Sequence, residues 1–119
     1  MLKPAVILVA ACLFSGSALA HAHLKAADPA ENAKVAASPA GLSLTFSEAL
    51  EAKLSGVTLK GPDGKTIATG TPVLDAKDGR VMRVPLEGRL PPGKYTVQWR
   101  ALSKDGHSTH GSYDFTVAP

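Results

Sequence analysis

Three stretches of the sequence alternate between apolar and polar residues, and this alternation constrains the fold more than any other feature. In residues 95–101 every second residue is apolar, and residues 42–47 and 112–117 follow the same pattern. Because neighbouring side chains of a β-strand point to opposite faces, this period of two predicts strands with one buried face. Weaker strand patterns, separated by turns rich in Gly and Pro, occupy residues 56–60, 71–74 and 82–86. About seven short strands at this spacing predict an all-β fold, an antiparallel β-sandwich or small barrel of the Ig-like or cupredoxin-like kind.

The segments between these strands predict little helix. Residues 48–54 (EALEAKL) fit either one helical turn or a bent edge segment. Residues 28–32 and 37–39 carry the Asp, Asn, Ser and Pro residues that are typical of loops. With no internal repeat and no low-complexity run, the sequence predicts one domain.

The first 20 residues have the features of a secretory signal peptide. Lys3 gives a positive start, residues 5–14 form an uncharged and mainly aliphatic run, and residues 18–20 (ALA) match the small-x-small cleavage pattern. The run is shorter than the about 20 apolar residues that a membrane-spanning helix needs. Residues 9–12 (VAAC) resemble a lipoprotein cleavage box, but a cut there would leave only about seven apolar residues ahead of it. We expect cleavage after Ala20 and a mature domain of residues 21–119.

Charge and cysteine content limit the partners and the stabilisation of this domain. The chain has 13 Lys and Arg against 10 Asp and Glu, and loss of Lys3 with the signal leaves a net charge of about +2. This balance, without any block of like charges, argues against nucleic acid as a partner. The only cysteine, Cys12, lies in the signal, so residues 21–119 cannot form a disulfide within the domain. Stability therefore has to come from packing.

All four histidines are expected near strand ends. His21 and His23 would open the mature chain, and His107 and His110 come just before the last strong strand. Asp105 and His107 are separated by one residue, so in extended backbone their side chains would project from the same side. The intervening glycine permits a tight loop that other residues avoid. The loop can therefore offer one carboxylate and one imidazole to a single ion.

Cleavage after Ala20 would add the α-amine and the imidazole of His21 to these donors. If the new terminus lies beside the Asp105–His107 loop, three nitrogens and one oxygen are available, a set that suits tetragonal Cu(II). Ni(II) shares this geometry but stands lower in the affinity order, and zinc more often collects His or Cys ligands tetrahedrally. Cu(I) prefers sulfur donors, and the mature chain contains only Met82. The residues therefore favour one Cu(II) ion per chain.

Four stretches of the mature chain together match a known family. They are HAHL at 21–24, LTFSE at 44–48, YTVQWRA at 95–101, and DGH at 105–107 continued through Gly111 to FTV at 115–117. With them the chain resembles the CopC family of periplasmic copper-resistance proteins over essentially its whole mature length. Asp-x-His alone would not carry this resemblance.

The resemblance implies a fold, a site and a setting. The fold would be a Greek-key β-sandwich, and the Cu(II) site would use the amine and ring of His21 with Asp105 and His107. Glu48, which follows the Phe-Ser pair, would lie near the site. The protein would sequester or deliver copper in the periplasm, beside an inner-membrane copper transporter of the CopD type, and we expect a monomer. The Met-rich Cu(I) site of some members is not expected, because only Met82 lies between residues 61 and 86.

Two histidines keep alternative roles. A free amine with histidine third in the chain is itself a copper and nickel chelator that uses backbone amides, and His21-Ala22-His23 meets this requirement. That chelate would not use the Asp105–His107 loop, so we expect His23 to be a first-strand residue or to support the metal without binding it. His110 is expected on a surface loop or in outer support of a ligand.

Two other functions compete with copper carriage. A copper-dependent oxidase of the histidine-brace type, similar to the lytic polysaccharide monooxygenases, would also begin on a ligating histidine. The chain is short for such a fold, and its mature aromatic residues mostly take core-facing positions, so no platform for a glycan is expected. An Ig-like adhesion module would leave the grouping of His21, Asp105 and His107 unexplained. We therefore predict a Cu(II)-binding protein that is not an enzyme.

Overall fold

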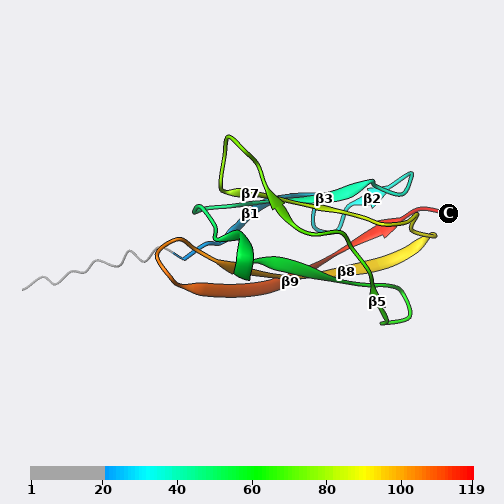
Figure 1. Ribbon diagram of the computed structural model, residues 1–119. Helices are drawn as coiled ribbons and strands as arrows, with labels where there is room; N and C mark the ends of the chain where they lie inside the picture. The colour runs from blue at the N-terminus through cyan, green and yellow to red at the C-terminus, as the bar shows by residue number, and fades with distance from the viewer. Residues whose placement is uncertain (1–20) are drawn as a thin grey trace, which may run out of the picture.

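This computed structural model describes residues 21–119. They form two β-sheets packed face to face (Figure 1). The signal-peptide prediction for residues 1–20 falls outside the described residues. The first sheet has the strand order β1 (Leu24–Asp28), β3 (Gly41–Phe46), β7 (Val81–Pro85), β6 (Val73–Leu74). The second has the order β2 (Lys34–Val35), β9 (Ser108–Val117), β8 (Gly93–Leu102), β4 (Gly56–Lys60), β5 (Thr66–Ile67).

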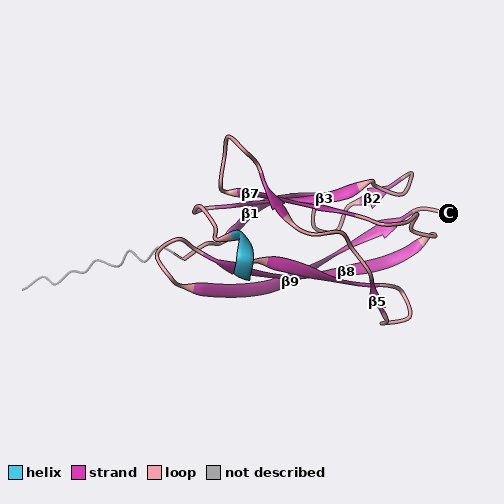
Figure 2. Ribbon diagram, in the orientation of Figure 1, coloured by secondary structure: helices cyan, strands magenta, loops and turns pink. Residues whose placement is uncertain are grey.

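The chain crosses repeatedly from one sheet to the other, after β1, β2, β3, β5 and β7. This confirms the predicted Greek-key β-sandwich. Nine strands are described instead of about seven, because the two-residue strands β2 and β5 were not predicted. The two-residue strand β6 lies within residues 71–74, where a weak strand was predicted. Pairings as short as those of β2 and β5 leave no alternation in the sequence by which to find them. Figure 2 shows one short helical turn, Ala52–Leu54, which lies in the segment where one turn or a bent edge was predicted.

The longest pairing in the protein joins β8 and β9. Its register runs without a break from Gly93 opposite Val117 to Leu102 opposite Ser108. The inward side chains of the two strands are those that the alternation predicted, with Tyr95 stacked on Phe115 at a ring distance of 5.6 Å. They pack against the buried side chains of β3, so the core lies between the two sheets.

Strand β9 begins four residues earlier than the alternation predicted, at Ser108. The first four residues of the strand, Ser-Thr-His-Gly, are not apolar, so their pairing with β8 is visible only in the hydrogen-bonded ladder. This extension carries the ladder to the end of the sandwich where the described chain starts (Figure 1). Within residues 21–119, no helix has the length and apolar character needed to cross a membrane.

The position of the Trp99 side chain depends on a glycine on the opposite strand of the β8–β9 hairpin. Gly111 lies opposite Trp99 in the β8–β9 register, and the indole packs edge-on against Phe46 with ring centroids 5.2 Å apart. A Cβ atom added at Gly111 would lie 2.6 Å from the indole ring, which is too close for two carbon atoms. The absence of a side chain at Gly111 therefore lets Trp99 close this end of the core.

We predict that Gly111→Ala destabilises the domain by about 1–3 kcal/mol, the usual result of overpacking a filled site. Chemical denaturation followed by the fluorescence of Trp99, the single tryptophan, would measure the loss. Gly88→Ala is the matched control, because nothing lies within 4 Å of a Cβ atom added there. Equal stability of the two variants would contradict the argument.

Candidate metal centre

The start of the described chain is docked between the two sheets. Ala22 is 0% exposed and belongs to the core, and its carbonyl accepts a hydrogen bond of 2.7 Å from the Thr109 hydroxyl on β9. Ser47, which follows β3, donates its hydroxyl to the His21 carbonyl at 3.0 Å and accepts the His23 N–H at 2.9 Å. The main chain of residues 21–23 is therefore held from both sheets, and the direction in which His21 leaves the core is fixed.

The Asp-x-His motif forms a turn at the end of the β8–β9 hairpin. Gly106 has a φ of +94°, in the left-handed region that glycine adopts without strain. Its N–H donates to the Ser103 carbonyl at 2.9 Å, and the Ser103 N–H donates to the His107 carbonyl at 3.0 Å. The sequence offered two routes that would bring Asp105 and His107 to one side, extended backbone and a tight loop through Gly106. The structure has the tight loop, with Gly106 in the left-handed region.

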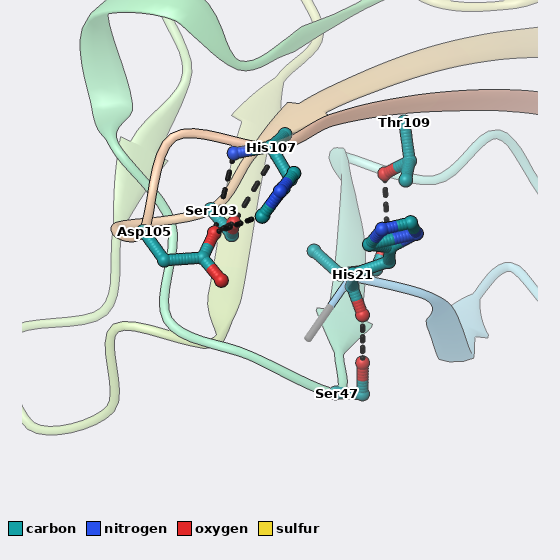
Figure 3. Close-up of polar contacts among 7 residues, drawn as sticks. His21, Ser47, Ser103, Asp105, His107 and Thr109 are labelled. Carbon is teal, nitrogen blue, oxygen red and sulfur yellow. Dashed lines mark hydrogen bonds and ion pairs between the residues drawn. The ribbon is translucent and has the colours of Figure 1, made fainter. Parts of the chain in front are cut away.

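One oxygen of Asp105 holds the turn in place. Oδ1 accepts the His107 N–H at 3.2 Å, lies 3.0 Å from His107 Nδ1, and accepts the hydroxyl of Ser103 (Figure 3). Ser103 is 1% exposed, so its hydroxyl is anchored within the fold. Because these contacts all use Oδ1, they leave Oδ2 for another partner.

The contacts keep Asp105 ionised. The Ser103 hydroxyl is the largest cause that holds the pKa of the Asp105 carboxyl below its usual value, and His107 contributes in the same direction. Partial desolvation of the carboxyl opposes them without reversing the shift. The turn therefore offers a negative charge beside an imidazole at neutral pH.

The structure places His107 beside both of the other predicted site residues, His21 and Asp105. The imidazole rings of His21 and His107 have centroids 5.1 Å apart, and the His107 ring lies between His21 and Asp105 (Figure 3). No three His, Cys, Asp or Glu side chains among residues 21–119 are arranged to hold a metal ion. Asp105 Oδ1 and His107 Nδ1 lie 3.0 Å apart and contact each other directly. The predicted set also needs the His21 α-amine, which a chain joined to Ala20 does not possess.

The other predicted residues lie apart from this group. His23 and His110 line a hollow of about 570 Å³ whose floor includes Trp99, and neither Asp105 nor His107 lines it. The four histidines therefore separate into two pairs, although the His21 and His23 rings are still only 6.1 Å apart. Glu48 is exposed and makes no hydrogen bond or ion pair with His21, Asp105 or His107.

Sequence reasoning missed three hydroxyl residues that position the site: Ser47, Ser103 and Thr109. Ser47 stood out in the sequence only as part of a family motif, and Ser103 and Thr109 did not stand out at all. Serine and threonine are common in strands and turns, so their type gives no signal. The partners of two of them also lie far away in the sequence. Ser47 contacts His21, 26 residues away, and Thr109 contacts Ala22, 87 residues away.

Comparison with known proteins decides the family. The sequence model of the CopC domain matches residues 24–118. The chain belongs to the CopC family. Its β-sandwich is similar to the crystal structure of CopC from Methylosinus trichosporium OB3b, with a TM-score of 0.78 and 33% sequence identity over 83% of this chain and 95% of that one.

Two curated relatives cover almost the whole CopC chain. Protein YobA from Escherichia coli K12 is 40% identical over 98% of this chain and 94% of its own length. Copper resistance protein C from Xanthomonas campestris pv. juglandis is 38% identical over 94% of this chain and 91% of its own length. The similarity therefore extends over the full domain and is not confined to the Asp-x-His turn.

We predict that Ser103→Ala raises the pKa of Asp105 toward its ordinary value, because the largest cause of the shift is removed. Nuclear magnetic resonance titration of the Asp105 carboxyl in the metal-free protein would measure it. Since the pKa is depressed in the fold, the contact stabilises the protein above the unfolded pKa, and this stabilisation is lost as pH falls through the folded pKa. The stability gap between wild type and variant should therefore shrink in acid.

Ser55→Ala is the control for this titration. Ser55 is a buried serine whose hydroxyl accepts the Leu102 N–H at 2.9 Å without touching Asp105. Its loss should lower stability and leave the Asp105 titration unchanged. An Asp105 pKa that moves equally in both variants would mean that general loosening of the loop, and not the Ser103 contact, sets the shift.

Proposed function

We propose that this CopC-family protein, after cleavage behind Ala20, binds one Cu(II) ion in the periplasm and sequesters or delivers it in copper homeostasis. The observation that carries the proposal is the approach of the His21 and His107 rings to 5.1 Å beside the ionised Asp105. The relatives named for copper resistance support copper as the cargo.

Each proposed ligand has an available donor atom. His107 has Nδ1 turned to Asp105, which leaves Nε2 for the ion. Asp105 has Oδ2 left, and His21 would supply its ring and its new α-amine. Three nitrogens and one carboxylate oxygen suit Cu(II) better than Cu(I).

The position of Met82 supports the oxidised ion as cargo. Met82 is the only methionine in residues 21–119, and it is 0% exposed within the core. Its sulfur is therefore shielded from an ion on the surface, and Cu(I) would find no cluster of sulfur donors.

The CopC family assignment makes the protein a copper-binding protein and not an enzyme. The five aromatic side chains of residues 21–119 are buried or half-buried, which leaves no exposed aromatic platform for a glycan. An oxidase of the polysaccharide monooxygenase type would need such a surface.

A membrane partner would exchange the ion at the exposed turn. The side chains of Asp105 and His107 are 43% and 54% exposed, so an ion held there is open to a second set of ligands. An inner-membrane transporter of the CopD type fits this role. The protein itself would act as a monomer, since the proposed ligands all come from one chain.

We predict that one extra residue ahead of His21 lowers Cu(II) affinity by more than about 100-fold. Outer positioning groups of a metal site already account for about 10–100-fold, and here a direct ligand, the α-amine, would be lost. Competition titration of mature protein beginning at His21, beside protein with a leading glycine, measures the difference. Equal affinity of the two forms would remove the amine from the site.

We predict that His107→Ala and Asp105→Ala weaken Cu(II) binding while His23→Ala has little effect, since only His107 and Asp105 stand beside the His21 ring on the proposed ligand side. Titration with Cu(II) gives the affinities, and electron paramagnetic resonance gives the number of nitrogen ligands, which should be three. Loss of binding in His23→Ala with a silent His107→Ala would identify the four-nitrogen chelate of the chain terminus instead.

A further inference from the structure

The first three mature residues contain two copper chelates that exclude each other. In the site proposed above, the His21 amine and ring act together with the Asp105–His107 turn. In the alternative, copper takes the amine, the amide nitrogens of Ala22 and His23, and the His23 ring. The second mode needs no folded protein, so something in the fold has to suppress it if the first mode is to operate.

Ser47 occupies one of the two amide nitrogens that the alternative chelate would use, that of His23. The His23 N–H donates to Ser47 Oγ at 2.9 Å, and the Ser47 N–H donates to the His23 carbonyl at 2.8 Å. Copper can bind the His23 amide nitrogen only after that nitrogen loses its proton. The contact with Ser47 would then be broken, and the segment would have to leave its place beside β3.

Thr109 removes the second amide from reach. Its hydroxyl donates to the Ala22 carbonyl at 2.7 Å, and Ala22 is 0% exposed. An ion in solution cannot approach the Ala22 nitrogen while the residue stays in the core. The two hydroxyl residues come from different sheets, so they hold opposite sides of the same three residues.

We propose that Ser47 and Thr109 are specificity-determining residues that hold the mature terminus for the His21–Asp105–His107 site and exclude the amide chelate. This inference rests on the proposed function, because it presumes a terminus at His21. Neither residue is a ligand. They act by positioning the backbone that carries His21.

The test uses mature Ser47→Ala/Thr109→Val protein with one equivalent of Cu(II). Electron paramagnetic resonance should change from a three-nitrogen to a four-nitrogen pattern, and adding His23→Ala should abolish the four-nitrogen form. Ser47→Thr/Thr109→Ser, which keeps both hydroxyls, should retain three nitrogens. A three-nitrogen pattern in the Ser47→Ala/Thr109→Val protein would overturn the inference while leaving the proposed function intact.

The matched control is Ser38→Ala/Thr96→Val. Ser38 accepts the Leu90 N–H at 2.8 Å and Thr96 donates to Asp114 at 2.7 Å, so the control also removes one serine and one threonine hydroxyl, but away from residues 21–23. It should keep the three-nitrogen pattern. A four-nitrogen pattern in the control would attribute the change to general loss of stability and overturn the inference.

Unfolding would also release the amide chelate, so near-ultraviolet circular dichroism has to confirm that each variant is folded. If the double variant does not fold, the single variants Ser47→Ala and Thr109→Val decide. A folded single variant with a measurable four-nitrogen fraction supports the inference, and folded single variants without such a fraction overturn it.

Hydrogen exchange of the His23 amide in metal-free protein is a second measurement. The exchange rate should increase at least about tenfold in Ser47→Ala. A four-nitrogen pattern already present in the wild type would overturn both this inference and the proposed site.

Discussion

The pairing of β8 with β9 is the interaction on which the rest of the structure depends. In residues 21–119, which contain no cysteine, this ladder of ten residue pairs is the longest continuous set of main-chain contacts. It supplies one wall of the core through Tyr95, Val97 and Phe115. It also ends in the turn that carries Asp105 and His107, so the rigidity of the core extends directly to the proposed ligands. This half of the site is positioned by the β8–β9 hairpin, and Ser103 anchors its turn.

The other half of the site belongs to neither sheet alone. Residues 21–23 lie in the seam between the sheets, where Ser47 reaches them from the β3 side and Thr109 from β9. Residues 21–23, which include His21, therefore fill the space between the two sheets at this end of the sandwich. Any shift of one sheet against the other would change the distance between His21 and the Asp105–His107 turn. Packing of the core and geometry of the proposed ligands are coupled through this segment.

The sequence predicted the parts of the structure that leave a periodic or chemical pattern. Alternation located β3, β8 and the inward face of β9, and the Asp-x-His spacing located the turn. It could not locate β2, whose two residues pair in parallel with the end of β9, because two residues carry no period. For Asp105 and His107 it left extended backbone and a tight loop through Gly106 both open, and the positive φ at Gly106 shows that the loop is the one formed. The positioning roles of Ser47, Ser103 and Thr109 could not be predicted for another reason. Hydroxyl contacts across the fold depend on which segments meet in space, and the sequence alone does not give this.

The enclosure of Ala22 sets an order of events for a chain that is made with a leader. A peptidase has to hold the residues on both sides of the bond that it cuts in an accessible, extended form. Ala22 is the second residue beyond the bond after Ala20, and in the folded domain it is fully enclosed. If the chain is cut after Ala20, as the sequence predicts, the cut would therefore come before residues 21–23 enter the seam. Because the proposed amine ligand appears only with that cut, the chain would remain unable to capture copper in this way until it has been delivered across the membrane and processed.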